Sequence, residues 1–418
     1  MTDDPPGCFL SLTGVGTRYD LLCERCADTA GPGDPLLEVC EGCIERAEEW
    51  SSVRGWRGAP EVRLRDGHPD GTWETRECSV HPANDRCAAA LPTGWLVLTP
   101  NGLAEIDGDG DVRRIGPVEL PTEPANTWAG RVRGPALHAS RDGRFAGVVT
   151  DYGRHGVVVD MGSGKPVVAL DRGANHPETT PFPIAFIGTG AATVVVAATD
   201  WNRLDAFDAA TGRLLTRRET ECAKDAERPE HYLDYFHGGL SVSPSGARLL
   251  DDGWVWHPVG VPKVIDVHAW LSGDTFAAEH GDDLTYRDYA WDQPVAWLDE
   301  RTVAIQRIGF DDEAMIDGVQ IFDVVASKRI GMFAGPVGPM WAHDNRLYVN
   351  NGAGLEIWDP IEGARTGFLE GFRPTARDPV TGTLAEIAGG TLRTWRPAPA
   401  RPSDRPEGAS VPGRSFDC

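Results

Sequence analysis

Apolar and polar residues alternate in short runs through most of the chain between residues 60 and 396, the pattern expected of half-buried β-strands. Seven of these runs share one form, an alternating apolar stretch that ends in a bulky residue and is usually followed by Asp. They occupy residues 103–107, 157–160, 204–208, 254–257, 319–323, 355–359 and 392–395. Self-similarity at a period of about 20 to 50 residues is typical of a solenoid, a propeller or an array.

Each run also has a fixed place inside a larger unit. Upstream lies a turn rich in Ser, Pro, Asp and Gly, such as residues 140–143 or 243–246, and an apolar strand follows it. Downstream comes a second turn and another short strand, as in residues 209–215. Gly, Asn and Asp accept the backbone angles that reverse a chain between antiparallel strands. The unit therefore predicts a four-stranded blade.

Two segments carry a resemblance to a known superfamily. Residues 357–359, Ile-Trp-Asp, and residues 241–249, Ser-Val-Ser-Pro-Ser-Gly-Ala-Arg-Leu, resemble the blade phrases of WD40 or YVTN-like propellers. The resemblance covers roughly residues 60–396 and implies an all-β fold, a seven-bladed β-propeller. It does not specify function, because one fold hosts many unrelated activities.

The seventh unit lacks its last strand, because residues after 395 are rich in proline, which lacks a backbone donor. An unassigned alternating run, from Val62 to Arg65, precedes the first unit. We expect this run to supply the missing outer strand and to close the ring, which leaves no open edge. The predicted division is residues 1–58 as an N-terminal segment, 59–396 as the propeller and 397–418 as a disordered tail.

The formal net charge of −23 repels phosphate groups, so nucleic acid and anionic membrane surfaces are disfavoured as partners. The charge either only keeps the protein soluble or matches a basic protein partner. No run approaches the 18 or so apolar residues that span a bilayer, and the first residues are acidic where a secretory signal is basic and then apolar. We expect a cytoplasmic monomer.

Four cysteines form two Cys-x-x-Cys pairs separated by thirteen residues: Cys23, Cys26, Cys40 and Cys43. Four thiolates at such spacing suit tetrahedral zinc, and residues 44–50, which follow the second pair, predict a helix. The segment resembles zinc-ribbon and treble-clef knuckles, which implies a structural zinc. Disulfides, a redox site and chance clustering are the alternatives. Residues 1–60 hold eleven acidic residues against five Arg and no Lys, which disfavours a nucleic-acid-binding knuckle.

Long insertions at residues 171–183, 219–238 and 272–291 fall on one face of the predicted disc, between consecutive blades. Loops of this length in a compact fold are usually functional or disordered. Inner loops of the same face combine aromatic residues with Arg and Asp, the composition of interface anchors. The alternative is that these polar residues cap their own turns. The predicted partner-binding residues are Tyr152, Arg154, His155, Trp201, Arg203 and Phe310.

The sequence contains no Gly-rich phosphate loop, nucleophile elbow or His-Glu-x-x-His helix. Residues 107–111, Asp-Gly-Asp-Gly-Asp, look like a calcium loop but lack its distal Glu, and a strand turn is the better interpretation. A non-enzymatic protein-interaction scaffold is therefore favoured. The alternative is a propeller hydrolase or lactonase with a metal ion in the central channel, which an inward-facing cluster of at least three carboxylates would support.

Overall fold

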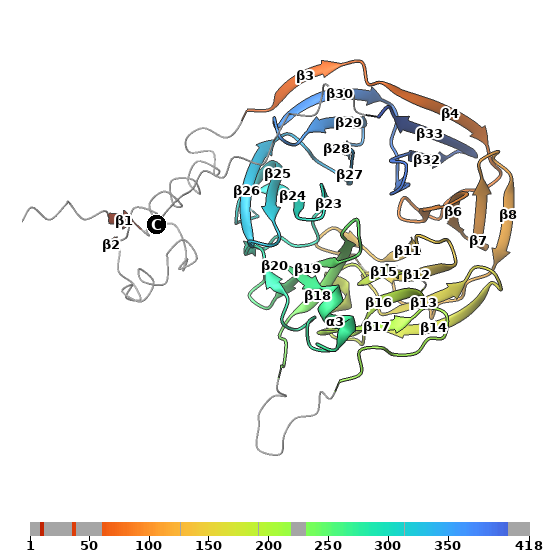
Figure 1. Cartoon of the computed structure of the whole chain (residues 1–418), viewed down its shortest axis with the longest axis horizontal. Helices are drawn as coiled ribbons and strands as arrows, with labels where there is room; N and C mark the ends of the chain where they lie inside the picture. Colours follow the sequence, from red (N-terminus) through yellow and green to blue (C-terminus); the bar gives the residue numbers. More distant parts are fainter. Residues whose placement is uncertain are drawn as a thin grey trace, which may run out of the picture.

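The computed structural model describes residues 9–11, 36–38, 61–125, 127–190, 192–218, 231–312 and 314–399. Within this part of the chain, seven sheets are arranged in a ring, and their strands are antiparallel except for one parallel outer strand (Figure 1). The predicted zinc ligands Cys23, Cys26, Cys40 and Cys43, the predicted helix at 44–50 and the tail from residue 400 lie outside the described residues. A separate pair of short strands consists of β1 (Phe9–Ser11) and β2 (Leu36–Glu38).

The first three blades follow the chain order. Blade one contains β5 (Ala88–Leu91), β6 (Gly94–Thr99), β7 (Gly102–Asp107) and β8 (Val112–Gly116). Blade two contains β11 (Gly134–Ala139), β12 (Phe145–Asp151), β13 (His155–Asp160) and β14 (Lys165–Asp171). Blade three contains β15 (Ile184–Thr189), β16 (Ala192–Asp200) and β17 (Arg203–Asp208), and one bridge joins Phe207 to Leu214 at its outer edge.

The other four blades complete the ring. Blade four contains β18 (Phe236–Val242), β19 (Arg248–Val255), β20 (Val259–Asp266), β21 (Asp282–Asp283) and β22 (Arg287–Asp288), with α3 (Val267–Ser272) after β20. Blade five contains β23 (Val295–Trp297), β24 (Thr302–Ile308), β25 (Ile316–Asp323) and β26 (Lys328–Ala334). Blade six contains β27 (Met340–His343), β28 (Arg346–Asn350), β29 (Gly354–Asp359), β30 (Ala364–Glu370) and β3 (Arg63–Gly67). Blade seven contains β31 (Ala376–Arg377), β32 (Leu384–Ala388), β33 (Thr391–Pro397) and β4 (Gly71–Glu77).

Apolar side chains on both faces of the middle strands form the core between neighbouring blades. One cluster joins Phe145 and Val149 of blade two to Ile184 and Val195 of blade three, and all four are at most 1% exposed. The middle strands have nearly continuous apolar sequences, because each blade packs against another sheet on both of its faces. The ring is held by repeated sheet-to-sheet packing of this kind.

The turns between the first two strands of a blade have the predicted chemistry. In residues 140–143, Gly143 has a φ of 70°, which favours glycine. The hydroxyl of Ser140 accepts from the backbone N–H of Phe145 at 2.9 Å. In residues 243–246, Gly246 has a φ of 81°, and Ser243 accepts from Arg248 in the same way at 3.1 Å.

The outer strand of blade seven differs from the predicted one. β4 pairs antiparallel with β33 along its whole length, from Gly71 opposite Pro397 to Glu77 opposite Thr391. The predicted run from Val62 to Arg65 lies largely in β3 instead, which pairs in parallel with β30 of blade six. That assignment was wrong because the segment after it, rich in turn-forming residues, contains a strand of its own. Both strands run along the outer edge of the ring (Figure 1).

Blade four also departs from the predicted pattern. The phrase at residues 254–257 was expected to be its third strand, but Trp254 and Val255 end β19, and Trp256 and His257 lie in the turn that follows. The third strand is β20. Part of the predicted insertion at 272–291 forms β21 and β22, which pair with the outer edge of β20.

Candidate binding site on the loop face

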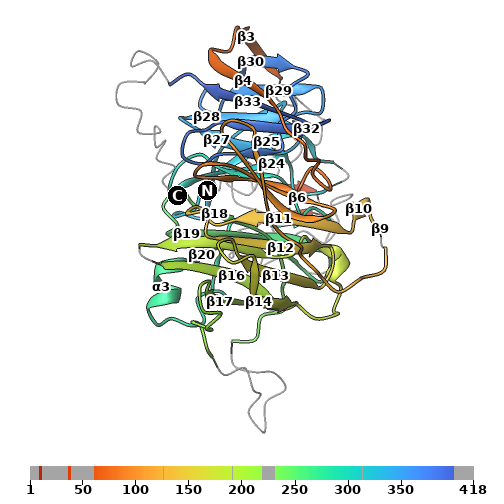
Figure 2. The same cartoon turned by 90° about the vertical axis from the view of Figure 1, so that its right-hand side faces the viewer.

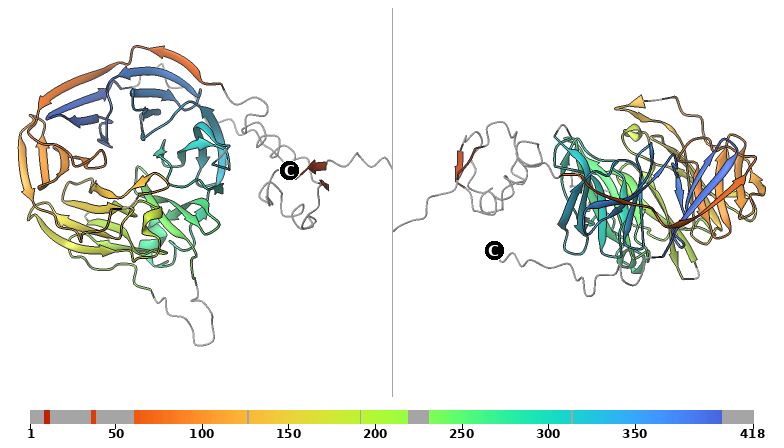
Figure 3. Two further views of the ribbon diagram at one scale, coloured as in Figure 1. Left: turned by 180° about the vertical axis from the view of Figure 1, so that it is seen from behind. Right: turned by 90° about the horizontal axis from the view of Figure 1, so that it is seen from above.

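The loops between the second and third strands of each blade and those between consecutive blades emerge on one side of the ring, here called the loop face. The connection from blade one to blade two contains a small hairpin, β9 (Thr127–Trp128) and β10 (Arg131–Val132). This hairpin projects beyond the ring (Figures 2 and 3). The connection from blade two to blade three contains a 3₁₀ turn, η2 (Pro177–Thr179).

A row of five aromatic rings links these loops. Trp128 lies 6.0 Å from Trp291 between ring centroids. Trp291 stacks on Trp254 at 4.8 Å, and Trp254 stacks on Phe236 at 4.5 Å, each pair with an interplanar angle of 14°. Phe236 lies 4.5 Å from Trp201. We call these five residues the aromatic row; its members come from loops or strand ends that are far apart in the sequence.

The aromatic row is fixed to η2 by hydrogen bonds. The indole N–H of Trp291 donates to the carbonyl of Thr179 at 2.8 Å, and that of Trp254 donates to its hydroxyl at 3.2 Å. The buried guanidinium of Arg172 donates to the carbonyl of Gly153 and to the hydroxyl of Thr180, at 2.8 and 2.9 Å. Burial lowers the pKa of Arg172 to about 10, so the side chain stays charged at neutral pH. The buried indoles of Trp254 and Trp291 and the guanidinium of Arg172 thus all have hydrogen-bond partners. We call the aromatic row together with Thr179 and Arg172 the platform.

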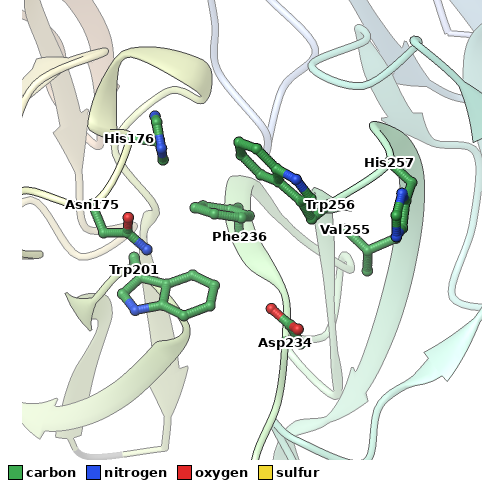
Figure 4. Close-up of a pocket in the computed structure, with 8 residues that line it drawn as sticks. All are labelled: Asn175, His176, Trp201, Asp234, Phe236, Val255, Trp256 and His257. Carbon is green, nitrogen blue, oxygen red and sulfur yellow. The ribbon is translucent and has the colours of Figure 1, made fainter.

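An open pocket of about 470 Å³ lies at one end of the aromatic row, between blades three and four. Trp256 is 54% exposed there and lies 5.5 Å from Trp254 and 5.3 Å from His176 between ring centroids. Figure 4 shows the rings of Trp201, Phe236, Trp256 and His176 facing a common space. The pocket is lined by Asn175, His176, Trp201, Asp234, Phe236, Val255, Trp256 and His257.

Two of these lining residues have strained backbones. His176 has a φ of 49° and His257 a φ of 125°, in the region where side-chain-bearing residues are uncommon. His257 precedes a proline, and the β19–β20 turn that contains it presents Trp256 to solvent. Such strain persists only where the surroundings impose it, and it is concentrated at functional sites.

A second hollow of similar volume lies on the same face between blades one and two, next to Glu123 and Arg133. The carboxylate of Glu123 accepts from the backbone N–H groups of Arg154 and His155 at 2.8 and 3.1 Å, and it contacts Nδ1 of His155 at 2.9 Å. The side chain of Arg154 pairs with Asp171 at 2.8 Å. The polar groups around this hollow therefore contact one another, and its lining contains no aromatic residue.

Tyr152, predicted as a partner-binding residue, lies in the β12–β13 turn and is half-buried. Its hydroxyl donates to Asp292 at 2.7 Å, and the guanidinium of Arg86 lies 5.4 Å from its ring. Tyr152, Arg154 and His155 thus belong to the contacts that hold the loop face together around blade two.

Trp201 is the predicted residue that lines the pocket. Arg203, two positions on, makes two hydrogen bonds to Asp205, at 2.7 and 3.2 Å, and so points into blade three. Phe310 is half-buried in the β24–β25 loop, with the guanidinium of Arg329 at 5.9 Å from its ring. The six predicted residues lie on the loop face, but they do not converge on one site.

The other aromatic residues of the pocket were not predicted as site residues. Phe236 lies at the end of the insertion 219–238, and Trp256 stands in the phrase that was taken for a strand. The one sequence signal for Trp256 was the His257-Pro258 pair after it, which is typical of a turn because proline restricts the residue before it.

The Asp-rich segment at residues 107–111 is a turn between two strands. Residues 107–111 form the predicted turn, in which Asp107 accepts from the backbone N–H groups of Asp109 and Asp111 at 2.9 and 3.0 Å. In the described part of the chain, no three His, Cys, Asp or Glu side chains are grouped so as to hold a metal ion. No described helix is long and apolar enough to cross a membrane.

No family profile and no curated protein sequence matches this chain. Several solved propeller structures resemble it in fold. A chain of "Crystal Structure of Mitotic Checkpoint Complex" aligns over 81% of this chain and 94% of its own length, at 12% identity and a TM-score of 0.49. The β-propeller domain of Cps50 (Swd1) from Myceliophteria thermophila covers 81% and 99%, at 13% identity and a TM-score of 0.45. BamB from Moraxella catarrhalis covers 78% and 100%, at 14% identity and a TM-score of 0.47. Similarity at this level carries no information on a partner or an activity.

Proposed function

We propose that this protein is a non-enzymatic interaction scaffold that binds a protein partner through the loop face, with the pocket between blades three and four as the centre of contact. The observation that carries the proposal is Trp256. This large apolar side chain is 54% exposed, although it stands beside the aromatic row, in which Trp254 and Trp291 are buried and donate hydrogen bonds to Thr179.

The pocket has the composition of an interface hot spot. Trp and Tyr are enriched among the residues that contribute most to binding, and they cluster where a partner excludes water. The rings of Trp201 and Phe236 form one wall and Trp256 another (Figure 4). Because the platform under these rings is held by Thr179 and Arg172, little conformational entropy is lost when a ligand orders it.

The test is a pull-down from a lysate of the native cell with the tagged full-length protein, followed by mass spectrometry. Trp256→Ala removes the exposed ring from the loop face. Ile361→Ala is the matched control, since Ile361 is 71% exposed and lies in the β29–β30 turn on the opposite face. We expect the parent and Ile361→Ala to capture the same partners, and Trp256→Ala to lose at least one of them with an unchanged melting temperature.

A Trp256→Ala variant that keeps every partner of the parent contradicts the proposal. If Ile361→Ala loses the same partners as Trp256→Ala, the proposal is also contradicted, because the loss is then not specific to the loop face.

A further inference from the structure

The hairpin between blades one and two reaches across the loop face to the connection between blades four and five. Its strands, β9 and β10, contain two residues each. Ala129 and Gly130 join them with φ values of 47° and 80°, the combination found in the tightest turns between paired strands. A two-stranded hairpin is at best marginally stable by itself, so its position depends on its contacts with the ring.

The base of the hairpin is firmly attached. The guanidinium of Arg133, which follows β10, donates to the carbonyls of Tyr152 and Pro124 at 2.8 and 2.5 Å. The guanidinium of Arg86 donates to the carbonyl of Val132 at 3.2 Å. These contacts fix the chain at the point where the hairpin leaves the ring.

The far end of the hairpin rests on Trp291 through longer contacts. The guanidinium of Arg131 lies 5.3 Å from the ring centroid of Trp128 and 4.9 Å from that of Trp291. Its Nε lies 3.3 Å from the carboxylate of Asp292, and its Nη2 lies 3.4 Å from the carbonyl of Trp291. Both distances exceed the usual range of about 2.7 to 3.2 Å. The hairpin is therefore held more tightly at its base than at its far end.

The hairpin covers an aromatic side chain of the platform. Trp254 stacks on Trp291, Trp128 and Arg131 of the hairpin lie against the same ring, and Trp291 is only 3% exposed. A cation–π contact changes an equilibrium by about two- to thirtyfold, which favours the closed position and leaves an open one accessible.

We propose that the hairpin is a latch, which Arg131 holds closed on Trp291 and whose opening uncovers the ring of Trp291 and the carboxylate of Asp292 on the loop face. The proposal goes beyond the proposed function, because it concerns a movement of the chain itself. It does not depend on whether the pocket between blades three and four binds a partner.

Limited proteolysis of the full-length protein tests the latch, because trypsin cuts after arginine and reaches the bond after Arg131 only when the hairpin leaves the ring. Mass spectrometry of the fragments gives the rate of this cut. When opening is faster than cleavage, the rate follows the open population. We expect Asp292→Asn and Trp128→Ala each to raise it about fivefold or more. Asp171→Asn is the matched control, because this carboxylate pairs with Arg154 on the same face, and it should leave the rate unchanged.

Two further measurements separate latch opening from unfolding of the ring. The bond after Arg248 should be cut equally slowly in all four proteins, because Leu249 is buried in β19. Hydroxyl-radical labelling, read residue by residue by mass spectrometry, should increase at Trp291 in Asp292→Asn. Trp270, which is 1% exposed, should stay protected.

Cleavage after Arg131 that is as slow in Asp292→Asn and Trp128→Ala as in the parent overturns the proposal, because these contacts then do not hold the hairpin. A rise that occurs only together with cleavage after Arg248 also overturns it, because the hairpin then leaves only when the ring unfolds. Faster cleavage without greater labelling of Trp291 shows that the movement does not uncover this ring, and it contradicts the proposal as well.

Discussion

Tyr152 donates its hydroxyl to the carboxylate of Asp292 at 2.7 Å across 140 positions of the sequence. The contact joins the β12–β13 turn of blade two to the segment that connects blades four and five. Burial raises the pKa of Asp292 to about 6, and the hydrogen bond from Tyr152 and the charge of Arg131 oppose this rise. The three side chains therefore form a clasp across the loop face next to the aromatic row.

The clasp makes stability depend on pH. The pKa of Asp292 is higher in the folded protein than its ordinary value of 3.8, so between those two pH values the folded state binds the proton more tightly than the unfolded chain. The contribution of this carboxyl to stability is thus greatest at low pH and falls as the pH rises from about 4 to about 6.

We expect Tyr152→Phe to lower the free energy of unfolding by about 2 kcal/mol at pH 7.5, where the charged carboxylate loses a donor, and by about 1 kcal/mol at pH 5. Urea unfolding at both values measures this. Tyr286→Phe is the control, because Tyr286 is 50% exposed and its hydroxyl donates to Asp283 near the surface, and it should change little at either pH. An equal loss at both values for Tyr152→Phe contradicts the expected link to Asp292.

We expect closure of the ring to depend on β4. Its pairing with β33 runs through seven residue pairs and covers the edge next to the buried Trp395. Deleting residues 1–77 should expose that edge to pairing with other chains and cause aggregation, seen as a loss of the monomer peak in size-exclusion chromatography. Deleting residues 1–60 leaves β3 and β4 in place and should give a folded ring. A monomeric protein after the longer deletion would show that the outer strand is dispensable.

Six of the seven repeated phrases correspond to third strands of blades, because alternation of apolar and polar residues reports directly on a strand between two packed neighbours. The fourth phrase failed for a local reason. The alternation at residues 254–257 belongs to the end of β19 and the turn after it, and the true third strand, β20, contains Pro262, which weakens the sequence signal of a paired strand. Because residues 254–257 were assigned to a strand, the turn that exposes Trp256 was not predicted.

The site was less predictable than the fold because its contacts join distant positions. Trp201 could be proposed from composition alone, and it lines the pocket. Nothing near Arg203 in the sequence shows whether its guanidinium faces solvent or the buried Asp205, to which it is bonded. The partners of Tyr152 and Trp254 likewise lie in other blades.

A buried ion-pair cluster between blades three and four should contribute strongly to stability. Arg218 is unexposed, lies 2.7 Å from Asp205 and also pairs with Glu279. Arg218→Ala leaves two buried carboxylates without this partner and should cost about 3 to 5 kcal/mol of stability, measured by urea unfolding. In Arg301→Ala, the lost pair with Asp323 involves an arginine that is 60% exposed, and the cost should stay below about 1 kcal/mol. Similar losses in the two variants would contradict this ranking.

We propose that Cys23, Cys26, Cys40 and Cys43 bind one structural zinc ion, from their spacing in the sequence. Elemental analysis of protein purified without chelator should find close to one zinc per chain. Cys40→Ser should release the metal and leave the melting of the ring unchanged, because the blades have a core of their own. Cys87→Ser is the control for metal content, since Cys87 is buried beside β5. A zinc content unaffected by Cys40→Ser contradicts the assignment.

Trp254 and Trp256 are two positions apart and should respond oppositely to truncation. Trp254 is 3% exposed, stacks on Phe236 and Trp291 and donates to Thr179, so Trp254→Ala should cost about 3 to 5 kcal/mol. Trp256→Ala removes a ring that is 54% exposed and should change the free energy of unfolding by less than about 1 kcal/mol, while it removes partner capture. Urea unfolding of both variants, together with the pull-down, distinguishes a structural role of Trp254 from a partner-binding role of Trp256. If Trp256→Ala is as destabilised as Trp254→Ala, its side chain belongs to the packed row and lost capture no longer identifies a binding surface.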